Sequence, residues 1–510
     1  MASIFRILKP NVASLGYALF LAINAAGVWG GVFPFLPMEF QTPEILLRFF
    51  LAQSLVFFLS YFASALGAYF FPGPTRRFLV VVASIPYFLG WCCLIAAMYI
   101  DKQAESLVVF GGALLGLGSA GFFMLWQRLF ASQESAVGNR DLIVGTFYAG
   151  LFYISLHLLP KAVTVFLIPL VFLPLFGLCI VLKSRDIDFA QPMFEDIPRQ
   201  HPSVYRGVIH DYWRSAISVG ALGFCCGVMR SFAIAEPETG SLVNILSMGT
   251  SMLTAFILIM LWQQKNIRFN ITAAYRFFFP FLISAFIVSP FLGETFSSSF
   301  ASVLHAVYSC SIMLMMIQCA QAARDRGVNP VFIYGVFGGI VYFLHDVGFI
   351  SETFVGNISV SSMSPLTAIS LIALYLLGLM YFIGQGGFKQ FRSKQRETAE
   401  NIELITLHPA KKPLPLHEQS KNRSFSTPQY RDRISKQCVA LQQHYRLSAR
   451  ETEVMELIAR GNSVVKIAEE LVVSENTIRT HSKRIYTKLA IHKKQELLDL
   501  IDAFSPITAH

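Results

Sequence analysis

SENTIRTHSKRIYTKL, residues 474–489, has the pattern of a helix with one apolar and one basic face. Ser474 stands at the position where a side-chain oxygen caps the first turn of a helix. The apolar residues Ile478, Ile485 and Leu489 return at helical spacing. Most of the remaining surface carries donors, namely Asn476, Arg479, Thr480, Lys483 and Arg484. A helix of this kind predicts a soluble domain that contacts nucleic acid through its basic face.

The residues before this helix predict a second, shorter helix and a tight turn. Ser448 and Glu451 are spaced as a capping box for a helix that carries Val454, Leu457 and Ile458, and Gly461 suits its C-cap. A short helix then follows from Ser463, with inward residues Ile467, Ala468 and Leu471. Two helices joined in this way form a helix-turn-helix, whose second helix enters the major groove of double-stranded DNA.

This segment closely resembles the LuxR-type helix-turn-helix. The resemblance is carried by Leu447-Ser448-x-Arg450-Glu451, Glu453-Val454, Leu457-Ile458-Ala459-x-Gly461, Ile467-Ala468, Ser474-x-x-Thr477-Ile478, His481 and Lys488-Leu489. It implies DNA contacts by Arg479, Thr480 and Lys483, with Asn476 and Arg484 beside them. The scaffold helix departs from the usual Ser-Asn-Lys-Glu, so the expected phosphate contact moves to Lys466, and Ala490 replaces a common Gly.

A last helix, from Lys493 to about Phe504, completes a four-helix domain. Members of the family usually dimerise through this helix. The resemblance therefore implies a homodimer on DNA, with Leu497, Leu498 and Ile501 as the apolar residues available both for the interface and for the core.

The rest of the chain has the composition of a membrane protein. Of the 510 residues 54% are hydrophobic, and 47 are phenylalanine. Residues 1–386 hold 20 Lys/Arg and 17 Asp/Glu, whereas the last 124 residues hold 21 and 14. A bilayer-spanning helix needs about 20 apolar residues. We expect an all-α fold with twelve spans, at 12–36, 45–71, 78–100, 106–130, 142–160, 162–182, 215–235, 241–262, 275–293, 297–320, 329–350 and 364–386.

The basic residues predict the orientation of these spans. Arg76, Arg77, Lys183 and Arg324 all fall in loops on one side, whereas the opposite loops carry only Lys102 and Lys161. Basic loops stay in the cytoplasm. We therefore expect a multi-pass protein of a bacterial inner membrane, embedded in the lipid bilayer, with both termini in the cytoplasm.

The predicted domains follow from this pattern. A membrane domain, 1–386, divides into halves 1–182 and 215–386 around a charged cytoplasmic loop, 183–214. Two six-helix halves resemble the major facilitator superfamily at the level of topology. The loop FFPGPTRRF lacks that family's acidic residue, which weakens the case for a transport function. A flexible basic linker, 387–429, and an amphipathic connecting helix, 430–446, then lead to the DNA-binding domain, 447–510.

Ionisable residues inside the spans are the candidates for binding a small-molecule effector, because such residues are costly in a membrane and are often functional. They are Arg48, Arg230, His305, His345 and Asp346. Arg48 and Arg230 lie near span ends, so an alternative is that they extend to the interface. His345 and Asp346 are adjacent, and we expect at most one of them to face a pocket. Arg230 pairs either with Asp346 or with a ligand.

Several functions are poorly supported by the sequence. Seven of the eight cysteines lie in predicted spans, and no His or second Cys pair stands at metal-ligand spacing, so neither a metal nor another cofactor is expected. No nucleophile–base–acid set indicates an enzyme. Two alternatives to a sensor remain open: a transporter whose DNA-binding tail reports flux, and a membrane anchor whose tail is released by cleavage.

Overall fold

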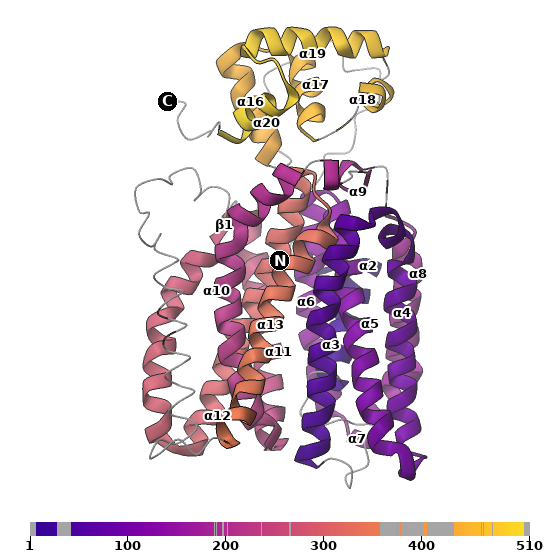
Figure 1. Cartoon of the computed structure of the whole chain (residues 1–510), viewed down its shortest axis with the longest axis vertical. Helices are drawn as coiled ribbons and strands as arrows, with labels where there is room; N and C mark the ends of the chain where they lie inside the picture. The colour runs from indigo at the N-terminus through magenta and orange to yellow at the C-terminus, as the bar shows by residue number, and fades with distance from the viewer. Residues whose placement is uncertain are drawn as a thin grey trace.

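The computed structural model describes residues 7–27, 42–187, 189, 191–195, 198–200, 202–235, 237–264, 267–357, 375, 378, 401–404, 433–460, 462, 464–471 and 473–503. Over these residues the chain is almost entirely helical, as expected, with one short two-stranded sheet in addition. Figure 1 shows a bundle of long helices, with the shorter C-terminal helices at one end of it.

The N-terminal half of the bundle consists of α2 to α8. Its elements are α2 (Val12–Gly27), α3 (Pro43–Phe70), α4 (Pro72–Ala97), η2 (Asp101–Gln103), α5 (Ala104–Ser132), α6 (Ser135–Leu158), α7 (Lys161–Leu167), the π-helical turn η3 (Ile168–Phe172) and α8 (Leu173–Ser184). Pro160 lies between α6 and α7, so the predicted break between the fifth and sixth spans is confirmed. The loop that follows holds α9 (Pro192–Glu195) and η4 (Pro198–Gln200).

The C-terminal half of the bundle begins with α10. Its helices are α10 (Pro202–Ala235), α11 (Pro237–Gln264), α12 (Ile271–Arg326) and α13 (Pro330–Asn357). Helical backbone runs through α12 without interruption, whereas the sequence predicted two spans there, 275–293 and 297–320. The twelfth predicted span, 364–386, lies almost wholly outside the described residues.

The lengths and compositions of these helices make this a multi-pass membrane protein. Among the described residues, eight helices are long and apolar enough to cross a bilayer, and α2 is a shorter apolar helix. Many of their leucines, valines and phenylalanines are exposed, as expected for side chains that face lipid tails. The count of twelve spans stays a prediction.

The halves meet mainly where α3 packs on α13 and α6 packs on α11, and α5 also contacts α12 and α13. Within the second half, α10 and α13 approach so closely that glycine is required at Gly227. A Cβ atom added there would lie 1.9 Å from the backbone oxygen of His345. Glycine is also required at Gly348 of α13, because a Cβ atom there would lie 2.1 Å from the backbone oxygen of Phe224. This close contact places Arg230 of α10 and Asp346 of α13 in the wall of the same cavity.

The small sheet ties a loop of the bundle to the chain that leads into the C-terminal helices. Strand β1 (Ile267–Asn270) lies between α11 and α12, and β2 (Asn401–Leu404) lies within the predicted linker. They pair antiparallel, with Ile267 opposite Leu404 and Phe269 opposite Ile402. Ile402 and Leu404 are fully buried in the core of the bundle. Residues 401–404 therefore form ordered structure where the sequence predicted a flexible linker. We call this sheet the clasp.

Five C-terminal helices surround a second, separate core. They are α16 (Arg433–Tyr445), α17 (Ala449–Ala459), α18 (Val464–Glu470), α19 (Glu475–Leu489) and α20 (Lys494–Ala503). The predicted connecting helix, α16, contributes Ile434, Cys438 and Leu441 to this core. Because that core is closed over by all five helices, α16 packs as part of the same unit as the helix-turn-helix. We call α16–α20 the C-terminal domain.

Candidate nucleic-acid interface and candidate ligand cavity

Helix α19 has the two faces that its sequence predicts. The Ser474 side chain accepts a hydrogen bond from the Thr477 backbone N–H at 3.2 Å, which confirms the N-cap. Ile478, Ile485 and Leu489 are buried. The predicted DNA contacts on this helix are all exposed: Asn476, Arg479, Thr480, Lys483 and Arg484. The apolar face thus anchors the helix and leaves its basic face open to solvent.

Helix α17 holds one end of α19 in place through an acidic residue. The capping box at Ser448 and Glu451 is confirmed, with both of its hydrogen bonds present. The same Glu451 carboxylate lies 2.7 Å from Lys488 Nζ, near the C-terminus of α19. Burial by itself raises the pKa of Glu451, but hydrogen bonds from Lys488 and Ser448 outweigh it and lower the pKa below its usual value. Glu451 therefore stays ionised and fixes α19 relative to α17.

Some of the other residues predicted in this domain lie among the described residues, and some do not. Leu497 and Ile501 point into the core, whereas Leu498 is half-buried. Of the three, Leu498 is the residue left for an interface with a second copy. Lys466 lies on α18, but its side chain is outside the described residues, as is Gly461. Ala490, in place of the common Gly, adopts the left-handed conformation with φ of 54°.

The bundle encloses a cavity of about 190 Å³ between its two halves. Helices α2, α3, α5 and α6 line it from the first half, and α10 to α13 line it from the second. Much of its wall is aromatic, with Tyr17, Phe50, Phe57, Phe123, Tyr308 and Tyr342. Because both halves contribute to the wall, a molecule in this cavity contacts both at once.

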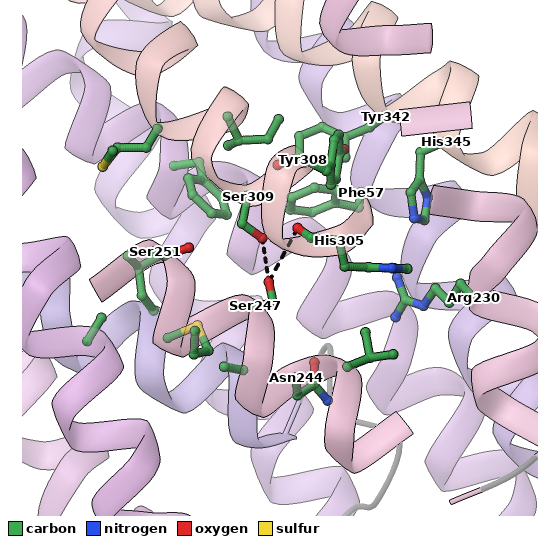
Figure 2. A pocket seen from close by; sticks show the side chains of 18 of the residues that line it. Phe57, Arg230, Asn244, Ser247, Ser251, His305, Tyr308, Ser309, Tyr342 and His345 are labelled. Atoms are coloured by element: carbon green, nitrogen blue, oxygen red, sulfur yellow. Dashed lines mark hydrogen bonds between the residues drawn. The ribbon is translucent and has the colours of Figure 1, made fainter. Parts of the chain in front are cut away.

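One end of the cavity holds four of the five ionisable residues that the sequence singled out. Arg230, His305, His345 and Asp346 all line it. Figure 2 shows Arg230 and the rings of the two histidines gathered at this end. His345 Nδ1 lies 3.3 Å from Asp346 Oδ1, and both residues face the cavity. The expectation that at most one of these neighbours faces a pocket is therefore wrong, because the cavity spans enough of the α13 surface to include both.

Arg48 is not part of this cavity. It lies near the start of α3, with about half of its side chain exposed, and it pairs with Glu44 and Glu105. These carboxylates satisfy its charge at the edge of the bundle. Its place in the predicted ligand site is therefore corrected: Arg48 is an interfacial residue, consistent with the alternative considered from the sequence.

Hydroxyl groups beside His305, which were not predicted from the sequence, also line the cavity. Ser247 of α11 lies 2.6 Å from Ser309 of α12, Oγ to Oγ (Figure 2). Ser251, Thr146 and Gln53 also line the wall. Serine and threonine are common in membrane helices, where their hydroxyls bond to the preceding turn. Their sequence pattern therefore carried no signal of a site.

Between the cavity and the α9 loop, polar contacts hold the two halves together. Arg324 of α12 donates to the backbone oxygen of Phe130 at 2.9 Å and to Asn139 Oδ1 at 3.2 Å. Gln127 of α5 donates to the backbone oxygen of Met316 at 3.2 Å. The residues next to Phe130 also contact the α9 loop, since Gln191 donates to the oxygen of Ser132. The halves are thus closed on the side of the α9 loop.

The geometry of the C-terminal domain, two short helices with a capped basic helix exposed, is that of a DNA-binding helix-turn-helix. Residues 445–501 match the model of the bacterial regulatory proteins of the luxR family. The C-terminal domain is therefore a LuxR-type DNA-binding domain, the type of domain found in transcription regulation, here joined to a membrane bundle.

Two transcription-regulatory proteins match a short stretch of this chain, no longer than the family match. The probable transcriptional regulatory protein NarL of Mycobacterium tuberculosis is 51% identical over 45 residues, which is 9% of this chain and 21% of that protein. The oxygen regulatory protein NreC of Staphylococcus aureus is 45% identical over 53 residues, which is 10% of this chain and 24% of that protein. The chain thus spans about a fifth to a quarter of the length of these relatives.

Two solved structures match about three quarters of this chain. The human organic anion transporter MFSD10 (TETRAN) superposes with a TM-score of 0.48 and 12% identity, over 75% of this chain and 99% of that one. The fucose:proton symporter FucP of E. coli superposes with a TM-score of 0.46 and 12% identity, over 76% of this chain and 98% of that one.

Proposed function

We propose that this chain is a membrane-embedded, one-component transcription regulator that senses a small molecule. The observation that carries the proposal is the cavity between the halves, joined in one chain to a LuxR-type domain. The C-terminal domain binds double-stranded DNA as a homodimer, with Arg479, Thr480, Lys483, Arg484 and Asn476 toward the groove. The protein lies in the inner membrane with both termini in the cytoplasm.

Occupation of the cavity shifts the balance between two arrangements of the halves. A ligand changes such an equilibrium only when it binds one arrangement more tightly than the other. The contacts of Arg324 and Gln127 on the α9-loop side belong to the arrangement described above. A ligand that draws the outer parts of the halves together weakens these contacts, because the halves rock about the cavity.

The clasp carries this change to the DNA-binding domain. Strand β1 connects α11 directly to α12, and these two helices provide Ser247 and His305 to the cavity. Strand β2 precedes the C-terminal domain in the chain. A shift of α11 and α12 therefore moves β2, the strand that precedes the DNA-binding domain.

Recovery of operator DNA with the membrane fraction tests the proposal. Cells that express the tagged chain are cross-linked, and promoter DNA should be enriched with full-length protein in washed membranes. Arg479→Ala with Lys483→Ala should remove the enrichment, whereas Arg48→Gln, at the edge of the bundle, should not. A DNA-bound fragment that has lost the bundle supports release by cleavage, and uptake of a solute by proteoliposomes supports the transporter. Either result contradicts the proposal.

A double-mutant cycle tests the role of the clasp without a ligand. Asp346→Asn should change operator affinity when the clasp is intact, because it removes a charge from the cavity. Leu404→Asp, which places a carboxylate in the buried side of the clasp, should abolish that change, whereas Glu403→Gln should preserve it. Additive effects of Asp346→Asn and Leu404→Asp would contradict coupling through the clasp.

A further inference from the structure

Two residues of opposite charge that line the cavity each carry one buried atom without a hydrogen-bond partner. Nη2 of Arg230 and Oδ2 of Asp346 are both inaccessible to solvent and unbonded. Both residues line the cavity. Leaving such atoms unsatisfied in a low-dielectric site costs free energy. A ligand that supplies both missing partners recovers that cost.

The neighbours of each group explain why the two do not satisfy each other. The guanidinium of Arg230 lies over the ring of Phe50, 4.4 Å from its centroid, a cation–π contact that uses its face and leaves its N–H edges free. The other carboxylate oxygen of Asp346 lies 3.3 Å from His345 Nδ1. Among the described residues, Arg230 forms no ion pair with Asp346. Each charge is therefore held by a neighbour of its own.

The histidines add acceptors beside Asp346. His305 Nδ1 lies 3.0 Å from the backbone oxygen of Ala301, which only accepts, so Nδ1 carries the proton and Nε2 is an acceptor. In neutral His345 the hydrogen bond to Asp346 likewise places the proton on Nδ1. The end of the cavity thus offers one cationic donor, one carboxylate oxygen and two imidazole acceptors. An ammonium group has three N–H donors, which matches the three acceptors.

The size and walls of the cavity suit one aromatic ring. A cavity of roughly 150 Å³ lined by apolar side chains holds benzene in another protein, and the cavity here has about 190 Å³. Its aromatic wall favours a flat apolar body, because aromatic pairs contribute beyond the area that they bury. The extra volume accommodates a short polar group attached to the ring.

We infer that the cavity binds a small aromatic zwitterion, a compound with one ring, one carboxylate and one ammonium group, as in an aromatic amino acid. The carboxylate accepts from Arg230, and the ammonium donates to Asp346 and the histidine acceptors. A zwitterion adds no net charge to a site that already holds one cation and one anion. An aromatic acid without an amine leaves Asp346 unsatisfied, and an aromatic amine without an acid leaves Arg230 unsatisfied. This inference rests on the proposed function and names the effector class.

Three probes that differ only in the polar group test it: L-phenylalanine, 3-phenylpropanoate and 2-phenylethylamine. Each is titrated calorimetrically into the full-length protein in lipid nanodiscs. L-Phenylalanine should bind at least about tenfold more tightly than either of the others, since each lacks one charge-assisted contact. Equal or tighter binding of the acid or of the amine would overturn the inference in favour of a single charge. Failure of all three to bind folded protein would overturn it as well.

Two variants assign the ends of the ligand. Arg230→Gln should weaken L-phenylalanine and 3-phenylpropanoate while leaving 2-phenylethylamine nearly unchanged. Asp346→Asn should weaken L-phenylalanine and 2-phenylethylamine while sparing 3-phenylpropanoate. Arg48→Gln makes the same arginine substitution outside the cavity and should change none of the three. If Arg230→Gln loses its thermal unfolding transition, Arg230→Lys takes its place and should retain binding of the acid. The same loss for all three probes in both variants would refute the assignment.

These measurements separate the effector class from the proposed function. The titrations contain no DNA, so a failed titration refutes the aromatic zwitterion and leaves a regulator with another effector. If L-phenylalanine binds as described and saturation leaves operator affinity unchanged, the site stands and the sensing function fails.

Discussion

Replacement of Ala490 by glycine should stabilise the C-terminal domain. Ala490 ends the recognition helix α19 with φ of 54° and ψ of 42°. Its N–H bonds to the oxygen of Thr487 at 3.3 Å, and the N–H of Ile491 bonds to the oxygen of Tyr486 at 3.0 Å. These two bonds form a Schellman motif, in which glycine is the usual left-handed residue. Ala490 thus completes the motif with a strained backbone.

The expected gain follows from two opposing contributions. The left-handed conformation costs a residue with a Cβ roughly 1–2 kcal/mol. Glycine also loses more conformational entropy than alanine on folding, which lowers the stabilisation by about 0.4–1 kcal/mol. Ala490→Gly should therefore raise the free energy of unfolding by about 0.5–1 kcal/mol, which corresponds to roughly 2–8 °C in a domain of this size.

Thermal unfolding of the 430–510 segment, followed by circular dichroism, measures this shift. The segment has a closed core of its own, formed by all five helices. Thr487→Gly provides the matched control: it lies three residues earlier at an exposed helical position, where glycine should lower stability by roughly 0.3 kcal/mol. An unchanged or lower melting temperature for Ala490→Gly would refute the assignment of a strained left-handed cap.

Three further changes probe the DNA interface, the Glu451 anchor and the contact between α10 and α13. Lys483→Ala should lower the slope of log affinity against log salt by about 0.9, because one phosphate contact is lost; an unchanged slope would mean that Lys483 faces away from the backbone. Because the pKa of Glu451 is lowered on folding, its contribution is present above its ordinary pKa and is lost as the pH falls through the folded pKa. Glu451→Gln should therefore destabilise the domain at pH 7 and converge with the unmodified domain under strong acid, and a pH-independent difference in chemical denaturation would contradict the ion pair with Lys488. Gly227→Ala should weaken L-phenylalanine binding by displacing α10 from the oxygen of His345, whereas Gly249→Ala on α11, where a Cβ meets nothing, should leave it unchanged; equal titrations of the two variants would contradict the role of that contact.

The C-terminal domain could be predicted well from the sequence because its signals are local. The capping box of Ser448 and Glu451 and the N-cap of Ser474 depend on residues three apart, and both are present. The periodic apolar residues of α19 are the buried ones. The ion pair between Glu451 and Lys488 could not be predicted, because these residues are 37 positions apart.

The membrane site could be predicted in part. A charge in an apolar span is costly wherever it lies, so the cost alone directed attention to Arg230, His305 and Asp346. The same rule selected Arg48. Its partner Glu44, four positions earlier, was visible in the local sequence, but its second partner, Glu105, lies 57 positions away and was not. The aromatic walls of the cavity could not be predicted, because in a chain with 47 phenylalanines an aromatic residue in a span does not mark a site.

The clasp shows why the junction between membrane and DNA could not be predicted. Strand β1 has four residues, IRFN, and pairs with residues more than 130 positions later. Four residues are too few for alternation to distinguish a strand from a loop. Under the proposed function this pairing matters for signal transmission, because a free linker between the bundle and the DNA-binding domain would relax displacements at its ends. The clasp holds β2 against the loop between α11 and α12, so less chain separates the bundle from the DNA-binding domain. The connecting chain then starts next to the two helices that carry Ser247 and His305. Under the proposed function, coupling between the cavity and DNA runs through these four residue pairs, and a change that opens them should separate ligand binding from DNA binding without altering either site.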